Sequence, residues 1–407
     1  MPECDVPRRP GRRVFLQTAA LGGALASCAK QDGDSPADQE PNRLGKPVSE
    51  YGQRSPFEKT VRKFRESKTP EASASFTPLQ DCHGILTPAS LHFERHHSGV
   101  PAIDPQRHRL LVHGLVERPT VFTMEDLRRM PSVSRLHFLE CSGNSSGDWG
   151  PKRAPDVQRG HGLASCSEWT GVLLRTVLGE LGLQPQAQWV IAEGADPCKM
   201  ARSLPLKKAM DDVILAYAQN GEAIRPEQGY PLRLVVPGWE GNINVKWLHR
   251  LKLTPEPYMT KDETSKYTDL LPDGKARLFT FEMDAKSVIT FPSGGQKLRA
   301  PGFYEITGLA WSGRGRIEKV EVSVDGGQSW RPAALEEPRL RMAFTRFRYP
   351  WRWEGGEAVL QSRCTDETGY TQPGLEELIA VRGMNSNYHN NSIKPWKVAA
   401  DGSVEAA

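Results

Sequence analysis

A change in hydrophobic pattern about two-thirds of the way along the chain most constrains the fold. Over residues 76–272, apolar runs typical of strands are mixed with stretches at helical spacing. From Arg277 onward, short strands separated by turns replace nearly all helical periodicity, and 317–324 (IEKVEVSV) alternates cleanly. Regular short strands predict a β-sandwich of immunoglobulin type. We therefore expect an α+β domain over 76–272, followed by an immunoglobulin-like β-sandwich with a C-terminal tail over 273–407.

The elements of the α+β domain follow one another in mixed order. Thr123 and Asp126 stand at the spacing of a capping box, and Gly182 ends a second helical pattern. Strands that do not alternate regularly with helices favour α+β over repeated βαβ units. We expect strands over 109–114, 135–140, 189–193, 213–217 and 232–236, and helices over 123–130 and 170–182.

The beginning of the chain has the features of an export signal. An arginine pair at 12–13 precedes the apolar run 18–26, as in twin-arginine signals, and the run is too short to span a membrane. Ala24, Leu25 and Ala26 fit a signal-peptidase site, whereas 25–28 (LASC) fits a lipobox in which Cys28 would be lipidated. Both alternatives stay open. We predict a signal over 1–28 and a periplasmic protein, lipid-anchored in the second case.

Composition limits the remaining function classes. Residues 29–75 are polar and proline-rich, and predict a linker with one short amphipathic helix over 57–64. Lys and Arg total 53 against 49 Asp and Glu, and no basic run is interleaved with aromatic residues, so we expect no nucleic-acid partner. The sequence lacks Cys-x-x-Cys-His, an iron–sulfur cysteine cluster and a Gly-x-Gly-x-x-Gly turn. We therefore expect no haem, flavin or NAD in this chain.

Cys141 is the first candidate for chemistry. It ends the apolar run 135–140 and opens a polar turn that contains glycine. A thiolate that a buried strand delivers to a loop suits a thiophilic metal or nucleophilic chemistry. The alternative is a buried free cysteine with a packing role.

Three motifs follow one another along the two expected domains: 140–144 (ECSGN), 237–248 (PGWEGNINVKWL) and 320–330 (VEVSVDGGQSW). In this order they resemble the sulfite oxidase family of molybdopterin enzymes. The first is similar to the loop with the molybdenum-ligating cysteine, the second to the segment that cradles the pterin, and the third to the dimerisation sandwich. The resemblance extends over roughly 76–390 and implies a molybdenum–molybdopterin cofactor with Cys141 as the protein ligand of the metal.

The resemblance also implies the residues that bind this cofactor. Arg233 would bind the terminal phosphate, because a planar guanidinium matches phosphate oxygens. Gln228 stands where vertebrate members often carry histidine. The other implied cofactor contacts are Phe93, Arg95, His97, Asp196, Ser203, Asn244, Val245 and Lys246.

Three residues are implied in catalysis. Arg95 and Arg382 would bind an anionic substrate, and the phenol of Tyr267 would hydrogen-bond at the reacting centre and pass a proton. Residues 93–97 (FERHH) and 385–392 (NSNYHNNS) are most similar to the branch with bacterial sulfane (sulfite) dehydrogenase subunits. The implied reaction is oxidation of sulfite or carrier-bound sulfane sulfur by oxo transfer.

The partners follow from the same resemblance. With no electron carrier of its own, the chain should pass electrons to a separate c-type cytochrome. A sulfur-carrier protein is a second candidate partner, and a homodimer or a heterotetramer with the cytochrome is expected. Two other functions stay open: nitrate or sulfoxide reduction by the same cofactor, and an exported binding module without catalysis, which predicts no metal.

Overall fold

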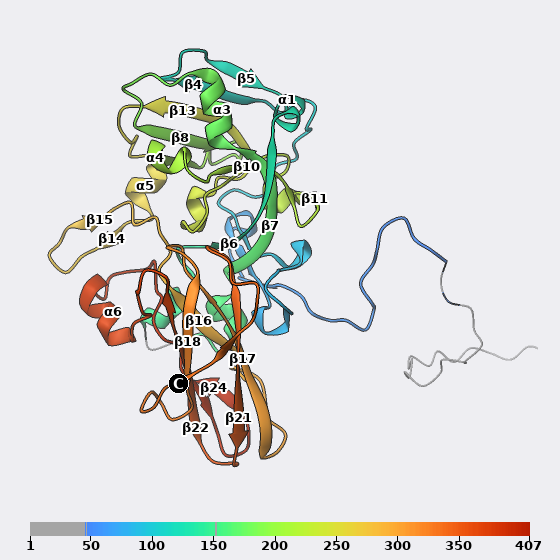
Figure 1. Cartoon of the computed structure of the whole chain (residues 1–407), viewed down its shortest axis with the longest axis vertical. Helices are drawn as coiled ribbons and strands as arrows, with labels where there is room; N and C mark the ends of the chain where they lie inside the picture. Colours follow the sequence, from blue (N-terminus) through green and yellow to red (C-terminus); the bar gives the residue numbers. More distant parts are fainter. Residues whose placement is uncertain (1–44, 46, 151–152) are drawn as a thin grey trace, which may run out of the picture. The chain divides into compact units, whose positions relative to one another are not determined.

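Figure 1 shows the computed structural model, which describes residues 45, 47–150 and 153–407. The signal predicted over 1–28 and its cysteine, Cys28, lie outside the described residues. The chain divides into two units, 1–58 and 59–407. The helix predicted over 57–64 is wrong: no helix forms there, and the side chains of Phe57, Val61 and Phe64 are exposed. An isolated short helix without a buried apolar face is not stable in water.

The second unit begins with a small three-stranded sheet. Strand β1 (Lys63–Phe64) pairs with β2 (Ala74–Phe76), and β2 pairs with β3 (Glu94–Arg95). The linker predicted over 29–75 therefore ends earlier than expected, because its last residues complete this sheet. The sheet also fixes the backbone of Arg95.

Two five-stranded sheets form the α+β part. Their strands are β4 (Leu110–Gly114), β5 (Thr120–Phe122), β6 (Ser132–Glu140), β7 (Ala164–Leu173), β8 (Trp189–Gly194), β9 (Ala201–Pro205), β10 (Ile214–Gln219), β11 (Glu222–Ala223), β12 (Arg233–Val235) and β13 (Leu248–Thr254). One sheet has the order β11-β10-β7-β6, with β12 paired to β10. The other has the order β5-β4-β13-β8-β9, in which only β4 and β13 run parallel. The five predicted strands are confirmed.

Short helices and turns lie between the strands of the second unit. The helices of the unit are α1 (Met124–Arg129), α2 (Val157–His161), α3 (Leu174–Leu181), α4 (Leu206–Ala209), α5 (Lys261–Ser265) and α6 (Leu375–Arg382). The 3-10 turns are η1 (Pro70–Ala72), η2 (Leu79–Asp81), η3 (Ala89–Leu91), η4 (Ser146–Trp149), η5 (Pro226–Gln228) and η6 (Gly241–Ile243). Helix α1 has the predicted capping box of Thr123 and Asp126. None of the helices in the described part of the chain has the length and apolarity to span a bilayer.

The helix predicted over 170–182 is only partly correct. Residues 170–173 complete β7, and α3 begins at Leu174. The apolar residues of this stretch pair on both sides, with β6 and β10, so sheet pairing overrides the helical spacing. Gly171 permits the close approach: a Cβ there would lie 2.1 Å from the Leu215 carbonyl oxygen.

The C-terminal part is the predicted β-sandwich. A hairpin, β14 (Asp269–Leu270) and β15 (Ala276–Arg277), crosses the predicted boundary at 272/273. The sandwich strands are β16 (Lys286–Phe291), β17 (Gly302–Trp311), β18 (Ile317–Ser323), β19 (Arg331–Pro332), β20 (Ala334–Leu335), β21 (Thr345–Trp353), β22 (Ala358–Asp366), β23 (Trp396–Val398) and β24 (Val404–Ala406). They form the sheets β16-β17-β21-β20 and β19-β18-β22-β23-β24.

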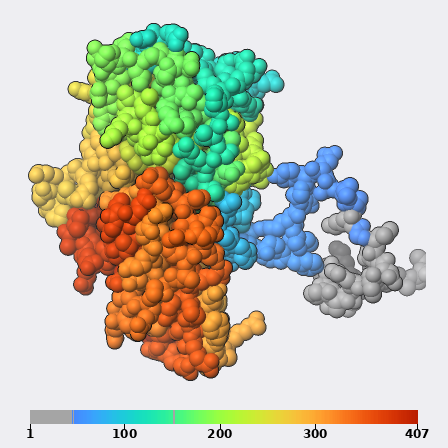
Figure 2. All heavy atoms as spheres, in the orientation of Figure 1, coloured from blue at the N-terminus to red at the C-terminus, as the bar shows by residue number. Residues whose placement is uncertain are grey.

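One core joins the two sandwich sheets. Trp311 and Phe347 of the first sheet and Leu360 and Trp396 of the second are fully buried together. The sandwich also touches the α+β part directly (Figure 2), and α2 packs against β16. This contact places the cysteine loop, which follows β6, close to the junction of the two parts.

Candidate active site

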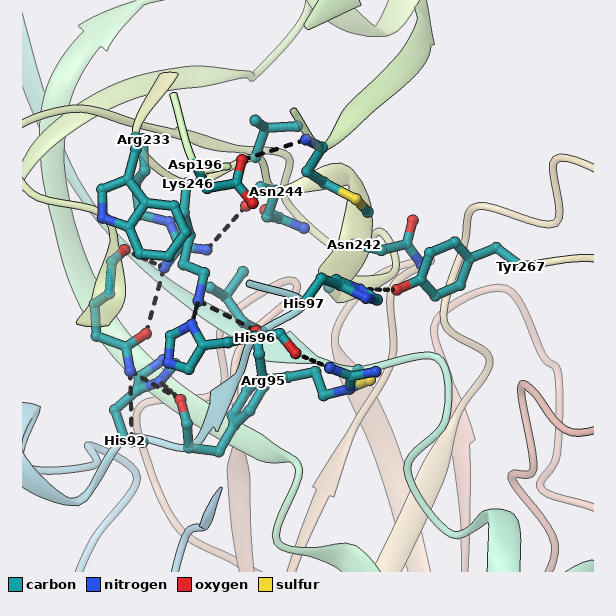
Figure 3. Close-up of a pocket in the computed structure, with 18 residues that line it drawn as sticks. His92, Arg95, His96, His97, Asp196, Arg233, Asn242, Asn244, Lys246 and Tyr267 are labelled. Carbon is teal, nitrogen blue, oxygen red and sulfur yellow. Dashed lines mark hydrogen bonds between the residues drawn. The ribbon is translucent and has the colours of Figure 1, made fainter. Parts of the chain in front are cut away.

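A single pocket gathers most of the predicted site residues (Figure 3). About 700 Å³ of space, partly open to solvent, lies between the cysteine loop, β3 and the segment that follows η6. The predicted residues that line it are Phe93, Arg95, His97, Cys141, Asp196, Gln228, Arg233, Asn244, Val245, Lys246 and Tyr267.

The loop after β6 presents Cys141 to this pocket. The Cys141 amide donates to the Leu163 carbonyl at 2.9 Å, and its carbonyl accepts from the Asn144 amide at 2.8 Å. Gly241 lies against the loop so closely that a Cβ there would be 2.9 Å from the Glu140 carbonyl oxygen. Burial raises the pKa of the Cys141 thiol, while the nearby Arg95 acts in the opposite direction. All five described cysteines are free.

Lys246 provides a cation on the opposite wall. Its Nζ donates to His96 Nδ1 at 2.8 Å and to the carbonyl oxygens of Arg95 and Glu227, each at 3.2 Å. Burial lowers the Lys246 pKa to about 7, and the positive charge of Arg233 contributes. A ligand with negative charge would favour the protonated form.

Arg233 is a second cation in the same wall. Its guanidinium donates to the carbonyl oxygens of Gln228 at 2.8 Å and of Asn244 at 3.1 Å, and stacks 4.8 Å above Trp169. Burial lowers its pKa to about 9. Within the described residues, its Nε has no hydrogen-bond partner, and neither has His92 Nε2 in the same pocket. Both atoms can therefore hydrogen-bond a polar group that enters the pocket.

Tyr267 and His97 face each other in the same pocket (Figure 3). The Tyr267 hydroxyl lies 2.9 Å from His97 Nε2. Burial, together with Arg95, lowers the His97 pKa to about 4, and burial raises the Tyr267 pKa well above its usual range. Both groups are therefore neutral at pH 7, and a proton can be shared along their hydrogen bond.

Two predicted residues do not line the pocket. Ser203 is buried in β9, where its amide and hydroxyl donate to the Glu263 carboxylate at 2.6 and 3.0 Å. Arg382, at the end of α6, lines a different pocket, and its guanidinium lies 3.3 Å from Asp284 and 3.9 Å from Asp269. In the structure Ser203 thus contacts Glu263 and Arg382 lies beside carboxylates, and the cofactor and substrate contacts expected of them stay predictions.

The prediction also missed several lining residues. His96 and Trp247 lie inside motifs that were recognised, so their neighbours in the sequence were a usable signal. His92 directly precedes one of these motifs. Asn242 lies inside the same motif as Trp247, whereas Met200 gave no distinctive signal of its own, although both line the pocket.

Comparisons with known proteins match both the α+β part and the sandwich. The model of the oxidoreductase molybdopterin-binding domain matches residues 97–261, and the model of the Mo-co oxidoreductase dimerisation domain matches 277–395. The chain is 34% identical over 375 residues to nitrate reductase [NAD(P)H] of Hordeum vulgare, covering 79% of this chain and 40% of that protein. It is 33% identical over 356 residues to nitrate reductase [NADH] of Ulva prolifera, covering 75% and 40%. The chain thus spans about 40% of the length of these relatives.

A solved structure matches almost the whole chain. The crystal structure of the sulfane dehydrogenase SoxCD from Paracoccus pantotrophus aligns with a TM-score of 0.88 and 47% identity, over 90% of this chain and 96% of that one. Fold and site together define a molybdopterin-binding oxidoreductase with a dimerisation domain. The chain belongs to the sulfite oxidase family.

The residues present fit this cofactor. Cys141 would ligate the molybdenum through its thiolate, Arg233 and Lys246 would bind the anionic phosphate, and the unpartnered His92 Nε2 suits a hydrogen-bonding ring. When bound, the cofactor supplies the redox centre for oxygen-atom transfer.

The Lys246 pKa predicts a pH dependence of stability. In the cofactor-free protein, the folded state holds this pKa at about 7, whereas an exposed lysine titrates near 10.5. Between these values the unfolded chain binds more protons, so the contribution of Lys246 makes the free energy of unfolding rise with pH over that range. Denaturant unfolding at several pH values should show that the free energy of unfolding rises less with pH in Lys246→Met than in the wild type. Identical pH profiles for the two proteins would contradict the prediction.

Proposed function

We propose that the chain oxidises an anionic sulfur species, sulfane sulfur or sulfite, and passes the electrons to a separate c-type cytochrome. The observation that carries the proposal is one pocket in which a thiol, a cation and a phenol converge: Cys141, Arg95 and Tyr267. The similarity of the chain to a sulfane dehydrogenase, over 90% of its length, supports a sulfur substrate.

The side chains divide the work as follows. The Arg95 guanidinium attracts the anion and orients its oxygens. Tyr267 and His97, joined at 2.9 Å, hold and move a proton at the reacting oxygen. The overall change adds one oxygen atom from water to sulfur and releases two protons and two electrons. A one-electron cytochrome acceptor would therefore be reduced twice per turnover.

The setting of the reaction belongs to the same proposal. The twin-arginine pattern supports export to the periplasm, where c-type cytochromes and sulfur-carrier proteins would be partners. The dimerisation domain supports a homodimer, or a heterotetramer with the cytochrome.

Nitrate reduction is the second candidate function. The observation that favours it is 34% identity to a nitrate reductase over 375 residues. Nitrate is also an anion, so the cation in the pocket does not separate the two reactions.

A substrate panel tests the proposal. Holoprotein from a host that makes molybdopterin is mixed with oxidised cytochrome c and with sulfite, thiosulfate or a sulfane-loaded carrier. We expect reduction of two cytochromes for each oxygen atom transferred to sulfur, which is two per sulfite oxidised, and no reduction with protein from a host that lacks molybdopterin. Nitrate consumption with a reduced dye, without any sulfur-dependent cytochrome reduction, would instead establish the second candidate.

A further inference from the structure

Tyr267 has a backbone conformation that its surroundings must hold in place. Its φ is 53°, in the left-handed region, which is unfavourable for a residue other than glycine. It lies two residues after α5, and its hydroxyl nevertheless points at His97 (Figure 3). Such a conformation persists only where other contacts fix it.

Arg202, which does not line the pocket, contacts Tyr267 and the helix before it. It lies in β9 with 1% of its surface exposed, and its Cζ is 5.1 Å from the centre of the Tyr267 ring. A guanidinium at this distance from a ring is in the range of a cation–π contact. Its Nε is also 3.4 Å from Glu263, a residue of α5. Arg202 thus contacts both the ring of Tyr267 and the helix that precedes it.

The same guanidinium connects Tyr267 to the cysteine loop. Arg202 Nη2 donates to Glu240 at 2.9 Å, and the other oxygen of this carboxylate lies 3.3 Å from His389 Nε2. The His389 amide donates to the carbonyl of Ser142, the residue after Cys141, at 2.8 Å. A continuous buried network therefore joins the tyrosine to the loop with the metal ligand.

We propose that Arg202 is a positioning residue that holds the Tyr267 hydroxyl at its working place beside His97 and Cys141. The inference rests on the proposed role of Tyr267 in proton transfer. Arg202 does not line the pocket in which substrate would bind, so its effect should fall on kcat rather than on KM.

The test is a double-mutant cycle in the holoenzyme. Arg202→Lys keeps the charge but loses the planar fork and its stacking. We expect kcat to fall about 10- to 100-fold with KM changed less than about twofold, because small misplacements of catalytic groups have effects of this size. In a Tyr267→Phe background, the same substitution should reduce kcat by less than about twofold, since no hydroxyl remains to be positioned.

Arg346→Lys is the matched control. Arg346 is 5% exposed and donates to the carbonyl oxygens of Gly84 at 2.8 Å and Cys82 at 2.9 Å, away from the pocket. It should leave kcat unchanged. If Arg202→Lys does not fold, Glu263→Gln, which removes the charge beside Arg202 but keeps the side-chain shape, should show the same dependence on Tyr267.

A second readout does not need turnover. The loss in Tm caused by Arg202→Lys, expected to be about 3 °C, should shrink by half or more when Tyr267 is replaced by leucine. This coupling can be measured even if no sulfur substrate is oxidised. Failure of the proposed function can therefore be told apart from failure of the Arg202 inference. Two results would overturn the role of Arg202. One is an equal loss in Tm from Arg202→Lys in the wild type and in Tyr267→Leu. The other is a loss in kcat from Arg202→Lys that is as large in Tyr267→Phe as in the wild type.

Discussion

Replacing Cys141 with serine should give a folded protein that has lost nearly all turnover. The two backbone hydrogen bonds that shape the loop use the Cys141 amide and carbonyl, so they do not depend on the sulfur. A serine oxygen is hard and poorly ionised, and cannot replace a soft thiolate on molybdenum. Even outer-shell substitutions around metals lower activity 10- to 100-fold, so loss of the ligand itself should exceed about 100-fold.

Three measurements on the same samples separate chemistry from folding: cytochrome c reduction, molybdenum per chain and circular dichroism. Cys82→Ser is the matched control, because Cys82 is partly buried and lies outside the pocket. It should retain wild-type rates and metal content. Full activity of Cys141→Ser would exclude the proposed metal ligand, and with it the proposed enzyme.

Contiguous motifs explain why so much of the site was predictable. Asn244, Val245 and Lys246 are neighbours in the sequence, so recognising one segment placed all three at the pocket. Cys141 was equally predictable from the sequence, because an apolar strand followed by a polar turn is a local pattern. The pairing of Tyr267 with His97 was not predictable, since 170 residues separate them.

The roles expected of Arg382 and Ser203 stay predictions, and the partners of their side chains could not be read from the sequence. Arg382 matched a motif, but its acidic neighbours Asp269 and Asp284 come from distant parts of the chain. Ser203 also matched locally, although its strand turns it toward Glu263. The helix predicted over 170–182 shows the same limit, because pairing with two other strands decided its first residues. Local pattern identified residue types, whereas tertiary partners decided their contacts.

The largest expected effect on stability comes from Lys286→Met. Lys286 Nζ donates to Glu140 at 2.6 Å, and both side chains are almost completely buried. Asn144 and Trp311 donate to the same carboxylate at 2.8 and 2.7 Å. This cluster joins β6, which ends one residue before Cys141, to strands β16 and β17 of the sandwich.

Methionine in place of Lys286 would leave the Glu140 carboxylate buried without its cation. Removing one partner of a buried ion pair typically destabilises a protein by about 3–5 kcal/mol, because the other charge remains uncompensated. Thermal or denaturant unfolding of the holoprotein would measure this loss. The double variant Lys286→Met with Glu140→Gln should recover part of it, since no net charge is then buried.

An exposed pair provides the control for this prediction. Lys297 lies 3.1 Å from Asp401, but both side chains are more than 60% exposed, at 63% and 61%. Solvent screens such a pair, so Lys297→Met should change the free energy of unfolding by less than about 1 kcal/mol. If Lys286→Met and Lys297→Met lower the free energy of unfolding by the same small amount, the Glu140 cluster is not what holds β6 to the sandwich.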